Sequence, residues 1–278
     1  VVDRNGANEI DERALEEAIR EVEAVAPDFG DLTFFEVMTV AGLVALERAG
    51  VSLNVVEAGL GARLDATRLV DAHVAVLTDL SLEHTAILGG TLEEIAREKA
   101  AVVRPHRPLV MAGAPVEVME LVKGIARDAG AELLAIDDRL HLVRHGDGTF
   151  DFDLAGRLVE RVRLSLRGAH QGRNALLAAR AAMSFDPSLD DGAIRRALAS
   201  TVWPGRLEVF TRSGTPPIIL DGAQNAHAAL ACARALSDPC EGFVAPFHIL
   251  FGALRDKNVP AMIEHLEPVA SSWWVTRP

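Results

Sequence analysis

The sequence predicts an α/β protein with a doubly wound, mainly parallel sheet, followed by a smaller α/β unit. Short β-branched or aliphatic runs alternate with helical stretches, as in a parallel sheet with helical crossovers. The apolar period changes to two between His141 and Leu166, which indicates a small antiparallel piece. Trp203-Pro204-Gly205 interrupts the pattern before the alternation resumes. We therefore expect two domains, residues 1–202 and 203–278.

Two helices are expected first. Residues 11–26 are charged, with apolar side chains recurring on one face. Residues 34–46 are apolar nearly all round, as in a helix packed between other elements.

Strands and helices then alternate. Thr91 and Glu94 have the spacing of a capping box at the start of one helix, and residues 115–129 form another. Three strands, each long enough to be buried on both faces, are expected at residues 53–56, 74–78 and 109–112.

The second half contains the antiparallel piece and the smaller unit. Asp147-Gly148 is a strong hairpin turn signal. Helices are expected at 172–183 and 188–198. Beyond Gly205 we expect strands at 218–220, 248–251 and 273–275 and helices at 226–236 and 259–269.

Composition excludes several classes of protein. With 49% hydrophobic and 24% charged residues, the chain is not wholly disordered. A net charge of −12 argues against binding to nucleic acid. The longest apolar runs, such as 41–46, are far shorter than a membrane helix, so no membrane partner is expected. Two cysteines are too few for a disulfide framework, which favours the cytoplasm.

The ends of the chain suggest a longer protein. Val1 is not an initiator Met, and Pro278 follows the last expected strand almost directly. We therefore expect these residues to be part of a longer chain. Val1 and Pro278 themselves lie outside the residues that the structure describes.

Polar residues follow the first two expected strands. Ligands of open α/β sheets bind at the carboxyl ends of strands, where Glu57, Asp79 and His84 are found. A carboxylate and an imidazole from neighbouring strand ends can ligate a divalent metal such as Mg²⁺. Taken singly, Glu57 also fits a cap or buried ion pair, His84 a loop hydrogen bond, and Lys99 a solvated helix residue.

The glycine pattern argues against NAD binding. Gly59 and Gly61 form half of a dinucleotide fingerprint, but Leu64 stands where the third glycine belongs. An NAD-dependent oxidoreductase is therefore disfavoured.

A third group of candidates lies further along the chain. Asn174 follows Gly168-Ala-His-Gln171 in an Ala-rich helix, and its amide can pair with an adenine edge. Arg206 stands at the expected hinge, where an arginine can clamp phosphate. Asp221 ends a strand and can accept a ribose hydroxyl or simply cap a helix.

Seven segments match a known family in its own order, from about residue 32 to residue 258. They are Leu32 to Glu36, Glu57 to Thr67, His84 with Leu88, Gly89 and Thr91, Ile95 to Ala100, Gly168 to Gln171 with Asn174, Pro204 to Arg206, and Asp221 to Asn225. Through them the chain resembles the folylpolyglutamate synthase/dihydrofolate synthase family, the folate branch of the Mur ligases. The resemblance implies an incomplete Mur-ligase central domain and a truncated Rossmann-like C-terminal domain.

The resemblance also implies an ATP-dependent acid–amino-acid ligase. Such an enzyme phosphorylates the carboxylate of a folate or dihydropteroate, and the amine of L-glutamate then attacks the acyl phosphate. Small molecules would be its only partners, and the family pattern implies a monomer.

Residue roles follow from the same resemblance. Glu57 and His84 match ligands of Mg²⁺, and Lys99 matches a carbamylated lysine that supports the metal. Asn174, Arg206 and Asp221 match positions that hold adenine, phosphate and ribose, and Lys99, Arg206 and His84 would be catalytic. The matched substrate-lining residues are Thr33, Phe34, Phe35, Glu36, Leu64, Asp65 and Ala66.

The chain also departs from the family pattern. No Gly-x-x-x-x-Gly-Lys-[Ser/Thr] phosphate loop occurs in the 278 residues. Gln224, Ala226, Arg68 and Ala62 replace the usual histidine, proline, asparagine and glycine. Two explanations follow: an incomplete and inactive portion of a ligase, or a non-catalytic folate- or nucleotide-binding homologue. The retained candidate residues favour the first.

Overall fold

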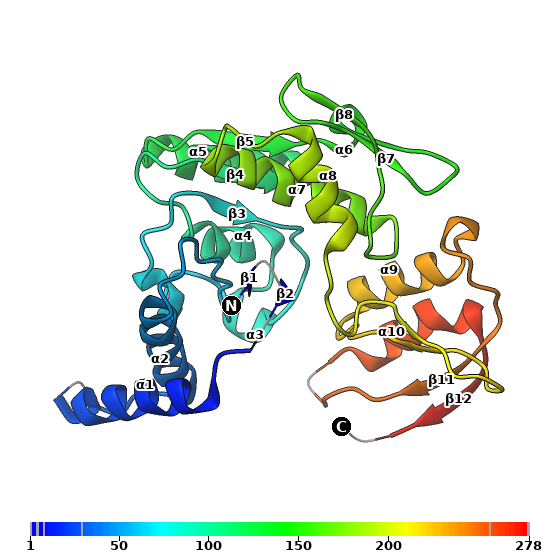
Figure 1. Ribbon diagram of the computed structural model, residues 1–278, viewed down its shortest axis with the longest axis horizontal. Coiled ribbons are helices and arrows are strands. Elements are labelled where there is room, and N and C mark those ends of the chain that lie inside the picture. The colour runs from blue at the N-terminus through cyan, green and yellow to red at the C-terminus, as the bar shows by residue number, and fades with distance from the viewer. Residues whose placement is uncertain (1, 4–5, 8, 29, 256, 277–278) are drawn as a thin grey trace. The chain divides into compact units, whose positions relative to one another are not determined.

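The computed structural model describes residues 2–3, 6–7, 9–28, 30–255 and 257–276. Their contacts divide the chain into two units (Figure 1). Unit 1 comprises residues 1–72 and 98–102, and unit 2 comprises residues 73–97 and 103–278.

Unit 1 is built around two helices. Asp11 accepts a hydrogen bond from Ala14 N at 3.1 Å and so caps the first helix. The helices pack through the small or β-branched side chains of Ala18, Val22, Ala41 and Ala45. The elements of unit 1 are β1 (Val2–Asp3), β2 (Gly6–Ala7), α1 (Glu12–Val25), η1 (Ala26–Asp28), α2 (Phe34–Arg48) and η2 (Ala66–Leu69). Both helices expected from the sequence are confirmed.

The prediction of a strand at residues 53–56 is wrong. The structure has no strand there, and Leu53 and Val55 are 55% and 92% exposed. A strand requires a neighbour that pairs its backbone N–H and C=O groups, and none of the described strands pairs with this segment. Four apolar residues do not by themselves specify such pairing.

Unit 2 contains the parallel sheet. Its strands are β3 (Ala75–Leu77), β4 (Leu109–Ala112) and β5 (Leu133–Ile136), in that order and all parallel. Every side chain of β4 is buried, which explains its unbroken apolar run. The helices of this part are α3 (Thr85–Leu88), α4 (Leu92–Ala100, which ends in unit 1), α5 (Val116–Asp128), α6 (Asp138–His141), α7 (His170–Phe185) and α8 (Asp191–Ser200).

A small antiparallel sheet follows, as the period of two predicted. It consists of β6 (Leu142–Arg144), β7 (Phe150–Asp153) and β8 (Leu158–Val162). The turn between β6 and β7 places Gly148 at φ +78°, a conformation that favours glycine. Phe152 of this sheet packs in one core with Leu176 of α7 and Val110 of β4.

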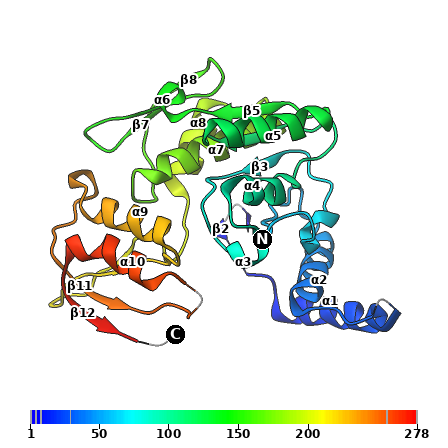
Figure 2. The same cartoon turned by 180° about the vertical axis from the view of Figure 1, so that it is seen from behind.

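The C-terminal part of unit 2 has its own core, which includes Ala229, Met262 and Val269. Its elements are β9 (Glu208–Phe210), β10 (Ile218–Leu220), α9 (Ala226–Leu236), η3 (Pro239–Glu241), β11 (Phe247–Phe251), α10 (Val259–Leu266), η4 (Glu267–Val269) and β12 (Ala270–Val275). Strands β11 and β12 are parallel, and both views show α9 and α10 on the same side of them (Figures 1 and 2). The domain boundary at residue 203 stays a prediction.

These elements confirm the α/β class, with parallel pairing in both larger parts of unit 2. Among the described residues, no helix combines the length and apolar character needed to cross a membrane.

Candidate functional site

The first turn of α7 places His170 among charged groups. Burial lowers the pKa of the His170 imidazole, and the opposing influences of Asp221, Arg206, Asp79 and His227 leave it below its ordinary value of 6.5. His170 is therefore predominantly neutral at pH 7. These charged groups come from separate elements of unit 2.

Asn174 belongs to a short chain of polar side chains on α7. Its Nδ2 donates to Gln171 Oε1 at 3.1 Å, and Gln171 Nε2 lies 3.1 Å from His170 Nε2. Gln171 is buried, whereas Asn174 is exposed. The amide of Asn174 is thus oriented from inside the protein while one face stays accessible to a ligand.

Arg206 is presented by a strained loop. Its neighbours Gly205 and Leu207 have φ of +72° and +47°, both in the left-handed region. Such conformations in residues other than glycine are costly and concentrate at functional sites. The Arg206 guanidinium lies over Gly222, where an added Cβ would stand 3.1 Å from Nη1.

Asp221 holds the same loop. Its Oδ2 accepts the Leu207 N–H at 3.0 Å, and its Oδ1 accepts the Ala223 N–H at 2.9 Å. Because a carboxylate oxygen accepts two hydrogen bonds, each oxygen keeps capacity for a hydroxyl group. Arg206 and Asp221, which the sequence suggests as a phosphate and a ribose ligand, are therefore joined through one pair of loops.

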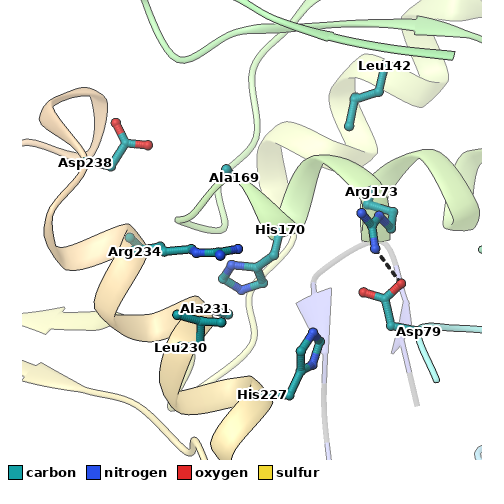
Figure 3. A pocket seen from close by; sticks show the side chains of 11 residues that line it. Asp79, Leu142, Ala169, His170, Arg173, His227, Leu230, Ala231, Arg234 and Asp238 are labelled. Atoms are coloured by element: carbon teal, nitrogen blue, oxygen red, sulfur yellow. Dashed lines mark hydrogen bonds and ion pairs between the residues drawn. The ribbon is translucent and has the colours of Figure 1, made fainter. Parts of the chain in front are cut away.

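A cavity of about 310 Å³ lies between α7 and α9 (Figure 3). His170 projects into it between Arg234 and His227, and Arg173 forms a 2.6 Å ion pair with Asp79 on its far side. The remaining lining residues are Leu142, Ala169, Leu230, Ala231, Ala235 and Asp238. Cationic and imidazole groups predominate on its polar wall.

His84 begins the short helix α3. It is the N-cap residue, with φ of +49°, and its backbone carbonyl accepts the N–H of Leu88 at 2.9 Å, but its side chain makes no capping hydrogen bond. The preceding residue, Glu83, accepts a hydrogen bond from Asn225 Nδ2, while Asn225 Oδ1 caps α9 through Ala228 N. The segment before His84 is thereby tied to the start of α9.

In unit 1, Glu57 is exposed and has no hydrogen-bond or ion-pair partner among the described residues. The loop after it is organised by Asp65, whose Oδ2 accepts the N–H groups of Gly59 and Leu60 at 3.0 and 2.9 Å. Burial raises the pKa of the Asp65 carboxyl, but hydrogen bonds, that of Thr67 foremost, outweigh burial and lower it overall.

Lys99 is half-buried near the end of α4, next to Glu98, which pairs with Arg63 at 2.8 Å. Glu57 and Lys99 belong to unit 1 and His84 to unit 2, so their convergence on one metal ion stays a prediction. In the described part of the chain, no three His, Cys, Asp or Glu side chains are grouped closely enough to bind a metal.

The expected substrate residues are of two kinds: apolar side chains on the surface or over the loop, and polar residues that hold the local backbone. Phe34 and Leu64 are 82% and 81% exposed, and the ring of Phe35 covers Gly59. Thr33 and Glu36 form a capping box at α2, in which the Thr33 N–H and hydroxyl hold Glu36 Oε2 at 2.7 Å. The hydrogen bond from the Thr33 backbone is the main reason that the pKa of Glu36 is lowered. Asp65 orders the adjacent loop, and Ala66 begins η2.

The departures from the family pattern have local explanations in part. Ala62 is buried with its methyl group accommodated, and Arg68 Nη1 donates to Ala101 O at 3.4 Å. Gln224 is exposed on the loop before α9. Nothing in the structure explains the choice of Gln224.

His170, Arg173 and His227 are not among the candidates that the sequence suggests. His170 stands close to Asn174 in the matched segment, and its place at the start of a helix is the available signal. His227 and Arg173 give no comparable signal, because they lie on separate helices, α9 and α7, that line one cavity only in the folded protein.

Comparisons with known proteins agree with the fold and the segments. No family model matches the chain. It is 37% identical over 259 residues to the probable bifunctional folylpolyglutamate synthase/dihydropteroate synthase of Haloferax volcanii, covering 88% of this chain and 30% of that protein. It is 34% identical over 269 residues to the dihydrofolate synthase/folylpolyglutamate synthase of Escherichia coli, covering 96% of this chain and 60% of that protein.

Solved structures show the same similarity. The Mycobacterium tuberculosis folylpolyglutamate synthase complexed with ADP and AMPPCP superposes with a TM-score of 0.85 and 31% identity, over 96% of this chain and 63% of that one. A folylpolyglutamate synthase complex with AMPPCP and folate also gives a TM-score of 0.85, with 27% identity, over 96% of this chain and 68% of that one.

The fold and these matches define an α/β protein of the Mur-ligase type. More particularly, the chain belongs to the folylpolyglutamate synthase/dihydrofolate synthase family. It spans between 30% and 60% of the length of the two curated relatives described above.

Proposed function

We propose that this chain is part of an ATP-dependent ligase that joins L-glutamate to the carboxylate of a folate or dihydropteroate through an acyl phosphate. The observation that carries the proposal is the joined pair of loops bearing Arg206 and Asp221, close enough to His170 for their charges to act on its pKa. The similarity to synthases complexed with nucleotide and folate supports it.

The donor set of unit 2 fits a nucleotide. The accessible amide of Asn174 supplies a donor and an acceptor for an adenine edge. The free acceptor capacity of Asp221 suits ribose hydroxyls, and Arg206 offers a planar guanidinium to phosphate oxygens. Bound ATP supplies the phosphoryl group, while Arg206 would offset the negative charge that develops during its transfer.

The donor chemistry of Glu57 and His84 fits a divalent cation, since one contributes carboxylate oxygens and the other an imidazole nitrogen. We propose that they hold Mg²⁺ together with Lys99 as a carbamate. The Lys99 ammonium must first lose one proton, because only the neutral amine is nucleophilic. Its nitrogen then bonds to the carbon of CO₂, the electron pair of one C=O π bond moves to oxygen, and a second proton leaves the nitrogen to solvent, which gives the carbamate anion. Bound Mg²⁺ supplies charge neutralisation at the phosphates.

Unit 1 would supply the folate or dihydropteroate site. The exposed side chains of Phe34 and Leu64 offer apolar contact to a flat ring system. Phe35 and Asp65 would shape the neighbouring loop, because each contacts or hydrogen-bonds Gly59. Thr33, Glu36 and Ala66 would shape the substrate site indirectly, because they fix the backbone at the starts of α2 and η2.

The lack of a phosphate loop in the 278 residues leads to a further part of the proposal. The phosphates lack a backbone cradle there, so we propose that these residues alone do not turn over ATP. Monomeric state and a cytoplasmic location stay predictions.

Steady-state kinetics of the gene product that contains these residues would test the proposal. Glutamate-dependent ADP release should fall by at least about 100-fold in Arg206→Met, because a charge that stabilises the transition state is removed. Arg212→Met, on the exposed loop after β9, is the matched control and should keep its rate. Equal rates in both variants would remove the ligase assignment. Tight nucleotide or folate binding without ADP release would support the non-catalytic homologue instead.

A further inference from the structure

The small antiparallel sheet of unit 2 is joined to the end of α9 by an arginine. Arg144, the last residue of β6, pairs with Asp238 through Nη1 and with Glu241 through Nη2, the latter at 3.0 Å. All three side chains are at most 24% exposed. One guanidinium therefore joins the carboxylate of Asp238, which caps the turn η3, to that of Glu241, the last residue of the same turn.

Other contacts cross the same junction. Arg167 Nη1 donates to Glu241 O at 2.8 Å, and its guanidinium stacks 5.2 Å from the ring centroid of Phe243. The Cys240 thiol donates to Gly146 O at 3.3 Å. The turn after α9 is thus held by three separate side chains, and Arg144 alone contributes two charge-assisted hydrogen bonds.

Helix α9 connects this junction to the candidate nucleotide site. It has 11 residues, and its two ends are therefore about 16 Å apart. At its first turn, Asn225 is hydrogen-bonded to Glu83, and the Asp221 loop precedes it. A short rigid helix that is held directly after its last turn, at Asp238, cannot tilt without moving its first turn.

We propose that Arg144 is a positioning residue for the candidate nucleotide site, which it reaches through α9. The two carboxylates hold the guanidinium in a fork that lysine cannot reproduce. The small antiparallel sheet then does more than fill the core. Through Arg144 it fixes the orientation of α9, and this preserves the hydrogen bond from Leu207 N–H to Asp221. The inference rests on the proposed function only where it calls the loops of Arg206 and Asp221 a nucleotide site.

Amide hydrogen exchange of the 278-residue chain would test this role without any ligand. In Arg144→Met, amides of residues 221–231 should exchange at least about 10-fold faster, while those of β4 keep their rates. In Arg144→Lys, the exchange rates of residues 221–231 should lie between those of Arg144→Met and of the unaltered chain, because a single ammonium replaces the two-pronged guanidinium. Arg161→Met, which breaks the exposed Arg161–Asp147 pair of the same sheet, is the control and should match the unaltered chain.

Two results would overturn the proposal. Unchanged exchange at residues 221–231 in Arg144→Met would show that the junction does not act on the site. Equally faster exchange in β4 would show that Arg144 serves general stability instead. If Arg144→Met does not fold, Glu241→Gln tests the same junction with the same readout. A titration of the gene product that contains these residues with MgADP separates the two proposals. Its failure to bind MgADP counts against the nucleotide site, while hydrogen exchange still decides the role of Arg144.

Discussion

The carboxylate of Asp221 accepts the backbone N–H of Leu207 at 3.0 Å, 14 positions away in the sequence. Leu207 is buried and has φ of +47°, so its conformation depends on the partners of its backbone. Since Arg206 directly precedes it, Asp221 also determines where that guanidinium is presented. An acid expected to contact ribose therefore has a second task inside the protein.

Replacing Asp221 by Ala should destabilise the loop and the chain. It removes both acceptors and leaves the Leu207 N–H without a partner, which costs about 1–3 kcal/mol. Urea unfolding would measure the loss. Asp186→Ala is the control, because the half-buried Asp186 side chain holds only the local turn at Ser188. Equal losses in the two variants would contradict the special role of Asp221.

Glycine is required at position 168 but not at position 124. Gly168 has φ of +100°, and an added Cβ would stand 2.5 Å from His170 Cε1. Gly168→Ala should therefore lower the melting temperature and displace His170. Gly124 lies within α5, with nothing within 4 Å of an added Cβ, and Gly124→Ala should stabilise the helix by about 1 kcal/mol. Thermal melts of both variants check the opposite signs.

The protein should lose stability as the pH falls below about 6.5, partly because of His170. In the unfolded chain this imidazole takes up a proton near its ordinary pKa of 6.5, whereas burial lowers its pKa in the folded protein. The free energy of unfolding therefore decreases from about pH 6.5 downward and levels off below the folded-state pKa. His170→Gln should weaken this dependence. A titration midpoint of His170 at or above 6.5 by NMR would contradict the expectation.

The two cysteines should differ in reactivity. Cys240 is exposed, whereas Cys232 is buried, and burial raises its pKa to about 12. Because the thiolate is the reactive form, one thiol should react with a disulfide reagent in the folded protein and two in denaturant. Cys240→Ser should abolish the native reaction. Rapid labelling of Cys232 in the folded state would contradict the packing of α9.

Lys99 should carry a carbamate if the proposed metal site forms. Intact-mass measurement of the gene product that contains these residues, with and without bicarbonate, should show one reversible adduct that is absent from Lys99→Arg. A bare amine at every bicarbonate concentration would reject the carbamate, while Glu57 and His84 could still be tested by metal titration.

Most helices and strands are predictable because their signals are local. The capping box of Thr91 and Glu94, confirmed by reciprocal hydrogen bonds, and the turn at Asp147-Gly148 each lie within a few residues. The apolar run of β4 also predicts its complete burial. Residues 53–56 look equally like a strand but form none, because pairing depends on a neighbouring strand that a local window does not contain.

The candidate site shows the same division. The residue types at positions 174, 206 and 221, with the family resemblance, predict nucleotide contacts, and these contacts stay a prediction. The sequence does not predict that Asp221 holds the loop that carries Arg206, or that His227 and His170 line one cavity. These partners come from separate elements that only folding brings together.

The order of apolar and polar residues along this chain was enough to determine its α/β class and most element boundaries, and the resemblance of seven short segments indicated its family. Only the tertiary structure decided which ionisable groups are buried near one another, as the lowered pKa of His170 shows. It also decided which segments far apart in the sequence are joined, as Arg144 of β6 and Glu241 after α9 are. The physical reason is that helix and strand periodicities act over a few residues. Burial and ion pairing depend on distances in space that no local pattern specifies.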